Sequence, residues 1–178
     1  FGSKYLAVRN EILKIKKVRS HNYLGINFGG SDPFGITVKV AKILKKIKWD
    51  KKTIFFIGKD FKDKEKLFST IKSIKNFYIK KFDIRSLLNA KILITSFSII
   101  AYEISYFNKL NLVVTLNKSI KLPNISLSKN FINLGFYKNL NNIFLQKNLK
   151  KYWHLKRKKI SYRIKTNANK KLLDILIN

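Results

Sequence analysis

The stretch that decides the fold is Asn22–Phe28 (NYLGINF), together with the loop that follows it, Gly29-Gly30-Ser31-Asp32-Pro33. The first segment is short, apolar and rich in residues that favour strands, and the glycines and proline end it sharply. From Ile36 to Ile47, apolar residues recur at helical spacing. The order strand, glycine-containing turn, helix is the building unit of α/β folds.

The same unit recurs along the chain after this stretch. Strands that are apolar on both faces alternate with amphipathic helices, which is typical of a parallel sheet covered on both sides. Further strands are expected at 53–57, 76–80, 91–95, 112–116 and 131–134, and helices at 61–74, 84–89 and 98–107. The last helix is expected to bury Ile100, Ile104 and Phe107.

These elements predict an α/β fold with a doubly wound, mostly parallel, Rossmann-like sheet over residues 1–150. The segment 151–178 differs, because it lacks strand patterns and carries many lysines. It is expected to form a basic helical tail packed on the sheet domain through residues such as Trp153. The chain contains no methionine and starts at Phe1, so an N-terminal part is expected to be missing.

The composition excludes several classes of protein. There is no cysteine, which excludes disulfides and thiolate metal sites, and two isolated histidines argue against a catalytic zinc site. The longest uncharged apolar stretch, Ile92–Tyr102, is roughly half of what a membrane-spanning helix needs. We therefore expect a cytoplasmic protein without a membrane span, metal or cofactor.

The net charge of +30 invites a nucleic-acid interpretation. However, the positive residues are nearly all lysines spread along the chain, with no compact basic and aromatic motif. Lysine, asparagine, isoleucine and phenylalanine are abundant together, as AT-rich codons produce. The pattern favours a solvated lysine surface over a nucleic-acid interface, and a lysine-rich RNA-binding protein remains the alternative.

Two loops between a strand and a helix carry candidate binding residues. In the first, Gly29–Pro33, glycines allow close backbone approach and the helix start offers amide groups to a phosphate. The competing interpretation is plain capping, with Ser31 or Asp32 as N-cap and Pro33 as the first helical residue. Asp32 repels an anion, so capping is expected for Asp32, with Gly30 and Ser31 facing a ligand.

The second loop runs from Thr95 to Glu103. Its hydroxyl and amide groups suit a phosphate, and Glu103 could accept hydrogen bonds from ribose hydroxyls. Alternatively, Ser96 or Ser98 only caps the helix. Because ligands of open α/β sheets bind at the carboxyl edge, the two loops together predict an anion or nucleotide site.

At these residues the sequence resembles a known family. The segments 2–11 (GSKYLAVRNE), 27–33 (NFGGSDP), 57–61 (IGKDF), 88–95 (LNAKILIT), 101–103 (AYE) and 132–135 (INLG) are similar to the C-terminal half of the UDP-2,4-diacetamido-2,4,6-trideoxy-β-L-altropyranose hydrolases. These enzymes act in pseudaminic acid synthesis, and related proteins serve spore-coat polysaccharide synthesis. Where the family has a glycine pair before the Tyr-Glu helix, this chain has Phe97-Ser98.

The resemblance implies the UDP-binding half of a GT-B architecture, related to family-28 glycosyltransferases, with catalytic groups in an N-terminal domain. It places Gly29, Gly30 and Ser31 near the diphosphate and Ser98 on a second phosphate loop. The other UDP-binding residues that it implies are Gly58 and Lys59 beside the uracil, Glu103 on the ribose, and Tyr102 and Asn117. A GT-B glycosyltransferase using a UDP-sugar is the alternative enzyme, and His21 is not a candidate catalytic residue.

Overall fold

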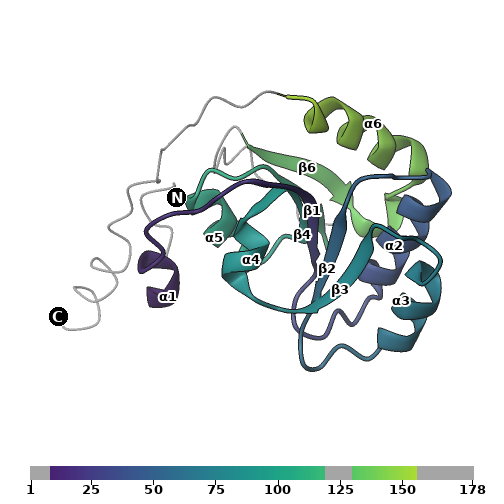
Figure 1. Cartoon of the computed structure of the whole chain (residues 1–178), viewed down its shortest axis with the longest axis horizontal. Helices are drawn as coiled ribbons and strands as arrows, with labels where there is room; N and C mark the ends of the chain where they lie inside the picture. The colour runs from purple at the N-terminus through teal and green to yellow at the C-terminus, as the bar shows by residue number, and fades with distance from the viewer. Residues whose placement is uncertain (1–8, 119–129, 156–178) are drawn as a thin grey trace.

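A six-stranded, entirely parallel sheet forms the centre of the molecule (Figure 1). The computed structural model describes residues 9–118 and 130–155. The strand order is β3-β2-β1-β4-β5-β6. The bounds are β1 His21–Asn27, β2 Thr53–Ile57, β3 Phe77–Lys81, β4 Ala90–Ser96, β5 Asn111–Thr115 and β6 Phe131–Phe136. The expected doubly wound α/β fold is confirmed.

Helices cover the sheet on both faces, as strands buried on both sides require. One face packs against α2 (Ile36–Lys46), α3 (Lys64–Ile71) and α6 (Asn142–Trp153), through a core that includes Leu24 and Ile26 of β1. The other face packs against α1 (Asn10–Leu13), α4 (Ile84–Leu88) and α5 (Ile99–Tyr106). Tyr23 of β1 points into this second core, so successive residues of one strand serve opposite layers.

Several expectations about individual elements need correction. Helix α3 is shorter than the expected 61–74, because turns precede Lys64 and follow Ile71. In α5, Ile104 is buried as expected, but Ile100 and Phe107 are only half-buried, and Glu103 and Tyr106 are buried instead. Helix α1 and most of α6 were not expected.

Helix α6 closes one end of the first core. Its N-cap is Asn141, whose side-chain oxygen accepts a hydrogen bond from the Phe144 amide. At its other end, Trp153 is buried and meets Trp49 edge to face, with ring centroids 5.1 Å apart. The helix runs through the expected domain boundary at residue 150, and residues 156–178 lie outside the described part, so the proposed division into domain and tail stays a prediction.

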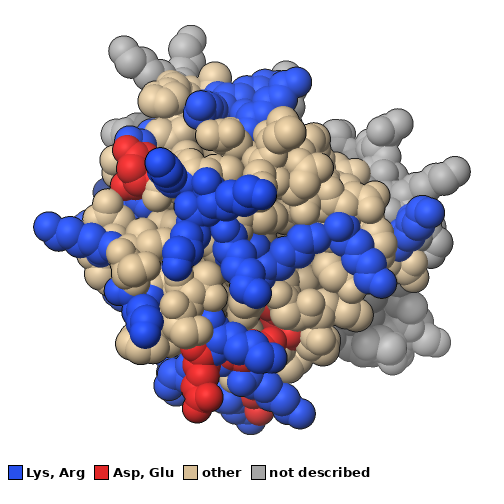
Figure 2. All heavy atoms as spheres, turned by 90° about the vertical axis from the view of Figure 1, so that its right-hand side faces the viewer, with Lys and Arg blue, Asp and Glu red and all other residues tan. Residues whose placement is uncertain are grey.

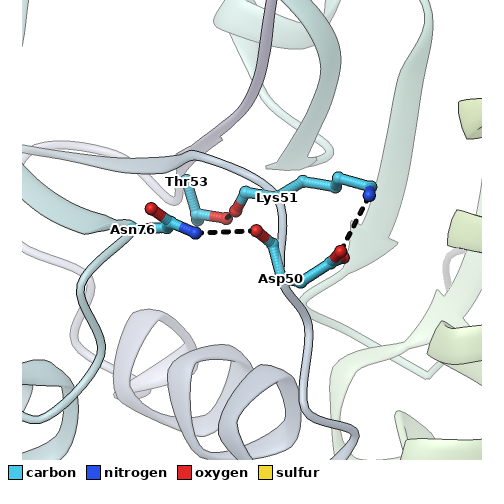
Figure 3. A network of polar contacts seen from close by, with 4 residues as sticks. All are labelled: Asp50, Lys51, Thr53 and Asn76. Atoms are coloured by element: carbon cyan, nitrogen blue, oxygen red, sulfur yellow. Dashed lines mark hydrogen bonds and ion pairs between the residues drawn. The ribbon is translucent and has the colours of Figure 1, made fainter.

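The amino edge of the sheet is tied together by polar contacts between loops (Figure 3). Asn76 donates to the carbonyl of Asp50 at 2.9 Å, and the Thr53 hydroxyl donates to the carbonyl of Lys51 at 3.0 Å. Lys51 also pairs with the Asp50 carboxylate at 2.8 Å. These contacts hold the start of β2 to the segment before β3, at the end of the sheet opposite the carboxyl edge.

A cap at helix α4 makes the stability depend on pH. The Asp83 carboxylate accepts hydrogen bonds from the amides of Arg85 and Ser86 at 3.3 and 2.9 Å. Hydrogen bonding from Ser86, more than any other contact, lowers the pKa of Asp83 below its ordinary value of 3.8. The cap is therefore fully formed above pH 3.8 and is lost as the pH falls through the lower pKa of the folded state.

We expect Asp83→Ala to lower the free energy of unfolding by about 1 kcal/mol at pH 7, the typical loss for an N-cap. The difference from the unmodified chain should shrink as the pH falls below 3.8. Urea denaturation at pH 7 and at pH 3 measures both values. A difference that stays constant between these pH values would contradict a charged cap.

Candidate functional site

The sheet changes winding direction between β1 and β4, and this point organises the candidate site. From β1 the chain proceeds outward to β2 and β3, whereas from β4 it proceeds the other way to β5 and β6. The two central strands pair in parallel with Asn27 opposite Thr95, so their carboxyl ends lie at the same level. Loops that leave such ends diverge and open a crevice, where open α/β sheets bind ligands.

The first loop is anchored by a buried asparagine that the sequence did not single out. The Asn27 side chain donates to the carbonyl of Phe56 in β2 at 2.8 Å, and its oxygen accepts from the amide of Gly29 at 3.2 Å. Gly29 has a φ of 99°, a conformation that favours glycine. The chain therefore turns at once after β1 and leaves Gly30 and Ser31 exposed.

Gly30 lies directly against Gly58, the residue that follows β2. A Cβ atom on Gly58 would lie 2.3 Å from the Gly30 carbonyl oxygen and 2.4 Å from its Cα. Only a glycine lets the two backbones approach this closely. The structure thus brings Gly30, expected near a diphosphate, directly against Gly58, expected beside a uracil.

The side chain of Asp32 caps the first amides of helix α2. Its carboxylate accepts hydrogen bonds from the amides of Ile36 and Thr37 at 3.1 and 2.7 Å, and the residue itself is buried with a φ of 42°. The Asp32 side chain caps these amides as expected, but the N-cap position itself is Gly35 and not Ser31 or Asp32. The expectation that Pro33 opens the helix is wrong, because the helix begins at Ile36. Gly30 and Ser31 remain exposed in this loop, whereas Asp32 is buried.

The second loop leaves its helix start without a side-chain cap. Ser98 occupies the N-cap position of α5, but its hydroxyl donates to the carbonyl of Ser96 at 3.3 Å, and no side chain caps this helix. The alternative in which Ser98 only caps the helix is therefore wrong. The positive end of α5 lies beside the crevice, where it favours an anion.

Phe97, which stands at the glycine pair of the resembled family, packs against two aromatic rings. Its ring lies 5.4 Å from that of Tyr102 and 6.2 Å from that of Phe131, between centroids. Tyr102 is half-buried, and burial raises the pKa of its hydroxyl. The extra side chain is thus accommodated among aromatic rings.

Glu103 is held by an arginine that the sequence analysis missed. The Arg9 Nε and Nη2 atoms donate to the two carboxylate oxygens of Glu103 at 2.6 and 2.8 Å. The Glu103 side chain is 0 % exposed, whereas that of Arg9 is 46 % exposed. The hydrogen bonds to Glu103 raise the pKa of Arg9. Arg9 donates to both carboxylate oxygens of Glu103. A ribose hydroxyl can therefore hydrogen-bond to Glu103 only if Arg9 moves away or gives up one of these two hydrogen bonds.

A cavity of about 770 Å³ adjoins Gly58 at the carboxyl ends of β2 and β3. Phe61 and the exposed ring of Phe68 give it an apolar wall, and lysines including Lys59 and Lys64 rim it. Asn117, another expected site residue, lies exposed just after β5, on the other side of the switch point. The structure therefore gathers one group of expected residues around Gly30 and Gly58, and another around the start of α5.

In residues 9–118 and 130–155, no group of three or more His, Asp or Glu side chains is placed to hold a metal ion. Over the same residues, no helix has the length and apolarity to cross a bilayer.

Comparison with solved structures assigns the fold class. The chain superposes with a TM-score of 0.62 on UDP-GlcNAc 2-epimerase from Methanocaldococcus jannaschii, solved with UDP-GlcNAc and UDP, at 19 % identity over 95 % of this chain and 49 % of that one. MurG from Acinetobacter baumannii gives 0.62 at 11 % identity, over 99 % and 55 % of the two chains. For UDP-GlcNAc 2-epimerase from Neisseria meningitidis, bound to UDP-GlcNAc, the values are 0.54, 14 %, 90 % and 45 %.

These similarities establish an α/β, Rossmann-like fold shared with about half the length of each of these proteins. No protein-family model matches the sequence, and no curated protein matches it significantly.

Proposed function

We propose that this chain is the nucleotide-binding half of an enzyme that acts on a UDP-linked sugar. The observation that carries the proposal is that two strand-to-helix loops leave the adjacent carboxyl ends of β1 and β4 at the switch point. One loop packs on Gly58, and the other ends at the start of α5, which no side chain caps. The 2-epimerase structures of the same fold were solved with UDP-GlcNAc or UDP bound. This supports a uridine nucleotide as the ligand.

In this proposal each part of UDP has its own partners. The diphosphate lies between the backbone of Gly29–Ser31 and the start of α5 at Ser98, where amides and the helix dipole favour negative charge. The uracil lies beside Gly58 and Lys59, at the mouth of the 770 Å³ cavity. Glu103 takes the ribose hydroxyls when UDP displaces Arg9, with Tyr102 and Asn117 completing the site.

The reaction we propose is hydrolysis. Water attacks the sugar carbon bonded to the diphosphate, the bond from that carbon to the phosphate oxygen breaks, and UDP leaves with the bonding electrons. This half would stabilise the charge that develops on the leaving diphosphate. By its resemblance, the substrate is a UDP-linked amino sugar of pseudaminic acid or surface polysaccharide synthesis in the cytoplasm, and an N-terminal domain of a GT-B enzyme supplies the catalytic groups.

A glycosyltransferase that uses a UDP-sugar is the second candidate. It is supported by the fold shared with a glycotransferase of kitacinnamycin, at a TM-score of 0.58 and 8 % identity. In such an enzyme an acceptor hydroxyl replaces water. Release of UDP from the sugar nucleotide with water as the sole acceptor, assayed with the partner domain present, would support the hydrolase and count against the transferase.

Calorimetric titration with UDP tests the nucleotide site itself. We expect UDP to bind with a dissociation constant below 1 mM, and UMP to bind more weakly because it lacks the second phosphate. Ser31→Glu should weaken UDP binding by about tenfold or more, since a carboxylate at this exposed position repels the diphosphate. Ser73→Glu is the matched control, because it makes the same charge change at an exposed position after α3.

Two results would contradict the proposed site. One is the absence of UDP binding at millimolar concentration, and the other is an equal loss of affinity in Ser31→Glu and Ser73→Glu. An RNA-binding protein, the remaining alternative, would instead bind RNA with an affinity that falls steeply with salt and would show no preference among nucleotides.

A further inference from the structure

The helices that cover the two faces of the sheet differ in lysine content. On one face, α2, α3 and α6 carry four, two and three lysines, respectively, as their sequences ITVKVAKILKK, KEKLFSTI and NIFLQKNLKKYW show. On the other face, α4 and α5 (IRSLL and IIAYEISY) carry no lysine and a single arginine, Arg85. Helices α4 and α5 expose only Arg85 and Ile99, whereas α2, α3 and α6 each expose several positions, and lysines occupy many of these. The lysines of the helices therefore gather on the face that α2, α3 and α6 cover.

The excess is strongest where α2 and α6 lie side by side. Neither helix contains an acidic residue, whereas α3 contains Glu65 and starts beside Asp63, which pairs with Lys66. Figure 2 shows Lys and Arg side chains gathered over this side of the molecule, with few acidic groups among them. We call the lysines of α2 and α6 the basic face: Lys39, Lys42, Lys45, Lys46, Lys147, Lys150 and Lys151.

A shallow groove of about 380 Å³ runs along the basic face. It is lined by Lys39, Lys42 and Lys46 from successive turns of α2 and by Asn142 at the start of α6. Lys39 is already engaged, because its Nζ donates to the carbonyls of Tyr137 and Lys138 at 2.7 and 2.9 Å. Lys42 and Lys46 are exposed and add their charge to the surface.

Three large apolar residues are exposed at the starts of the two helices that bear the basic face. Ile143 is 81 % exposed, Phe34 50 % and Phe144 40 %. Phe34 directly precedes Gly35, and Ile143 and Phe144 follow Asn142; Gly35 and Asn142 both line the groove. Exposure of large apolar side chains to water is unfavourable. Several of them exposed close together indicate a surface that contacts a partner or a membrane.

We propose that the basic face docks on an anionic lipid bilayer, with Ile143, Phe34 and Phe144 entering the headgroup boundary. Surface lysines are attracted to anionic headgroups, and exposed apolar residues beside them add burial. A bilayer is favoured over a nucleic acid because α2, α3 and α6 contain no arginine, the residue that reads bases and stacks on them. Ile143, the most exposed large apolar residue within the described ranges, is aliphatic and offers no ring for stacking a base.

The orientation has a consequence for the nucleotide crevice. Helices α2 and α6 both start at the carboxyl edge of the sheet, after β1 and β6. Docking through their lysines and through the exposed apolar residues at their starts would hold that edge close to the bilayer surface. The inference does not rest on the proposed function, because it requires no nucleotide and uses none of the residues assigned to UDP.

Cosedimentation of the full chain with vesicles tests the proposal. Vesicles of phosphatidylcholine with 30 % phosphatidylglycerol are compared with vesicles of pure phosphatidylcholine, from low salt to about 0.3 M salt. We expect binding to the anionic vesicles alone, weakening with salt. The triple change Lys42→Gln, Lys46→Gln and Lys150→Gln should lower the partition coefficient by at least about tenfold.

The matched control removes the same charge elsewhere, at exposed lysines away from α2 and α6: Lys14→Gln, Lys17→Gln and Lys118→Gln. This control should bind within about twofold of the unmodified chain. Ile143→Ser should weaken binding several-fold while leaving the salt dependence unchanged. Circular dichroism and thermal unfolding confirm that each variant is folded.

Three outcomes would overturn the proposal. They are no binding to anionic vesicles at low salt, an equal loss in the two triple variants, or tighter binding to single-stranded RNA than to vesicles with the RNA affinity lost in the basic-face variant. The last outcome would assign the same surface to a nucleic acid.

Discussion

Gly58→Ala is expected to lower the free energy of unfolding by about 2 to 3 kcal/mol, the upper part of the range for overpacking. The new Cβ atom would lie 2.3 Å from the Gly30 carbonyl oxygen and 2.7 Å from its carbonyl carbon. Both are backbone atoms, so no side chain can rotate away to relieve the contact. The loop after β1 or the loop after β2 must shift. Urea denaturation followed by circular dichroism measures the loss.

The matched control is Gly30→Ala on the opposite side of the same contact. A Cβ atom on Gly30 meets nothing within 4 Å. We therefore expect Gly30→Ala to change the free energy of unfolding by no more than about 0.5 kcal/mol. If the two variants were equally stable, the close packing of the two loops would be contradicted.

Arg9→Ala is the second change with a large expected effect. It leaves the fully buried carboxylate of Glu103 without its bidentate partner, and removing one member of such a pair typically costs about 3 kcal/mol or more. Because Arg9 is itself about half exposed, we expect a loss of about 2 to 4 kcal/mol in the free energy of unfolding. Urea denaturation again provides the measurement.

A double-mutant cycle separates the lost pair from general damage. Glu103→Met in the Arg9→Ala background replaces the stranded carboxylate with an apolar group of similar size, which buried sites tolerate well. The double variant should recover most of the stability lost in Arg9→Ala. The cycle is completed by Glu103→Met alone. If the loss of stability in the double variant equalled the sum of the losses in the two single variants, Arg9 and Glu103 would not stabilise each other.

The fold was largely predictable because its signals are local. The strand Thr53–Ile57 was located to the residue, since five buried positions stand between a charged turn and Gly58. Helix α6 was missed although its apolar residues Leu145, Leu149 and Trp153 recur at helical spacing and Asn141 is a favourable N-cap. The sequence therefore contained enough information to predict this helix.

The site was only partly predictable, because its decisive contacts are non-local. Arg9 and Glu103 are 94 positions apart, and the contact between Gly30 and Gly58 exists only after β1 and β2 pair. A weak signal for Arg9 was present, as it is one of only five arginines in a chain dominated by lysine. The capping role of Asp32 was predictable, since a carboxylate beside a helix start is a local feature.

The clustering of lysines on one side of the molecule could not be predicted from their positions in the sequence. In sequence they are scattered, and this favoured a solvated surface without a dedicated role. In space, α2 and α6 place seven of them on one side, because both helices pack on the same face of the sheet. The strand order that produces this arrangement is a property of the folded chain.

Amide chemical shifts recorded during titration with UDP test the central claim most directly. If a diphosphate binds between the two loops at the switch point, the largest changes should occur at Gly29–Ser31, at Gly58 and Lys59, and at Phe97–Ile99. Changes concentrated on the lysines of α2 and α6, or no saturable change at millimolar UDP, would contradict the nucleotide site.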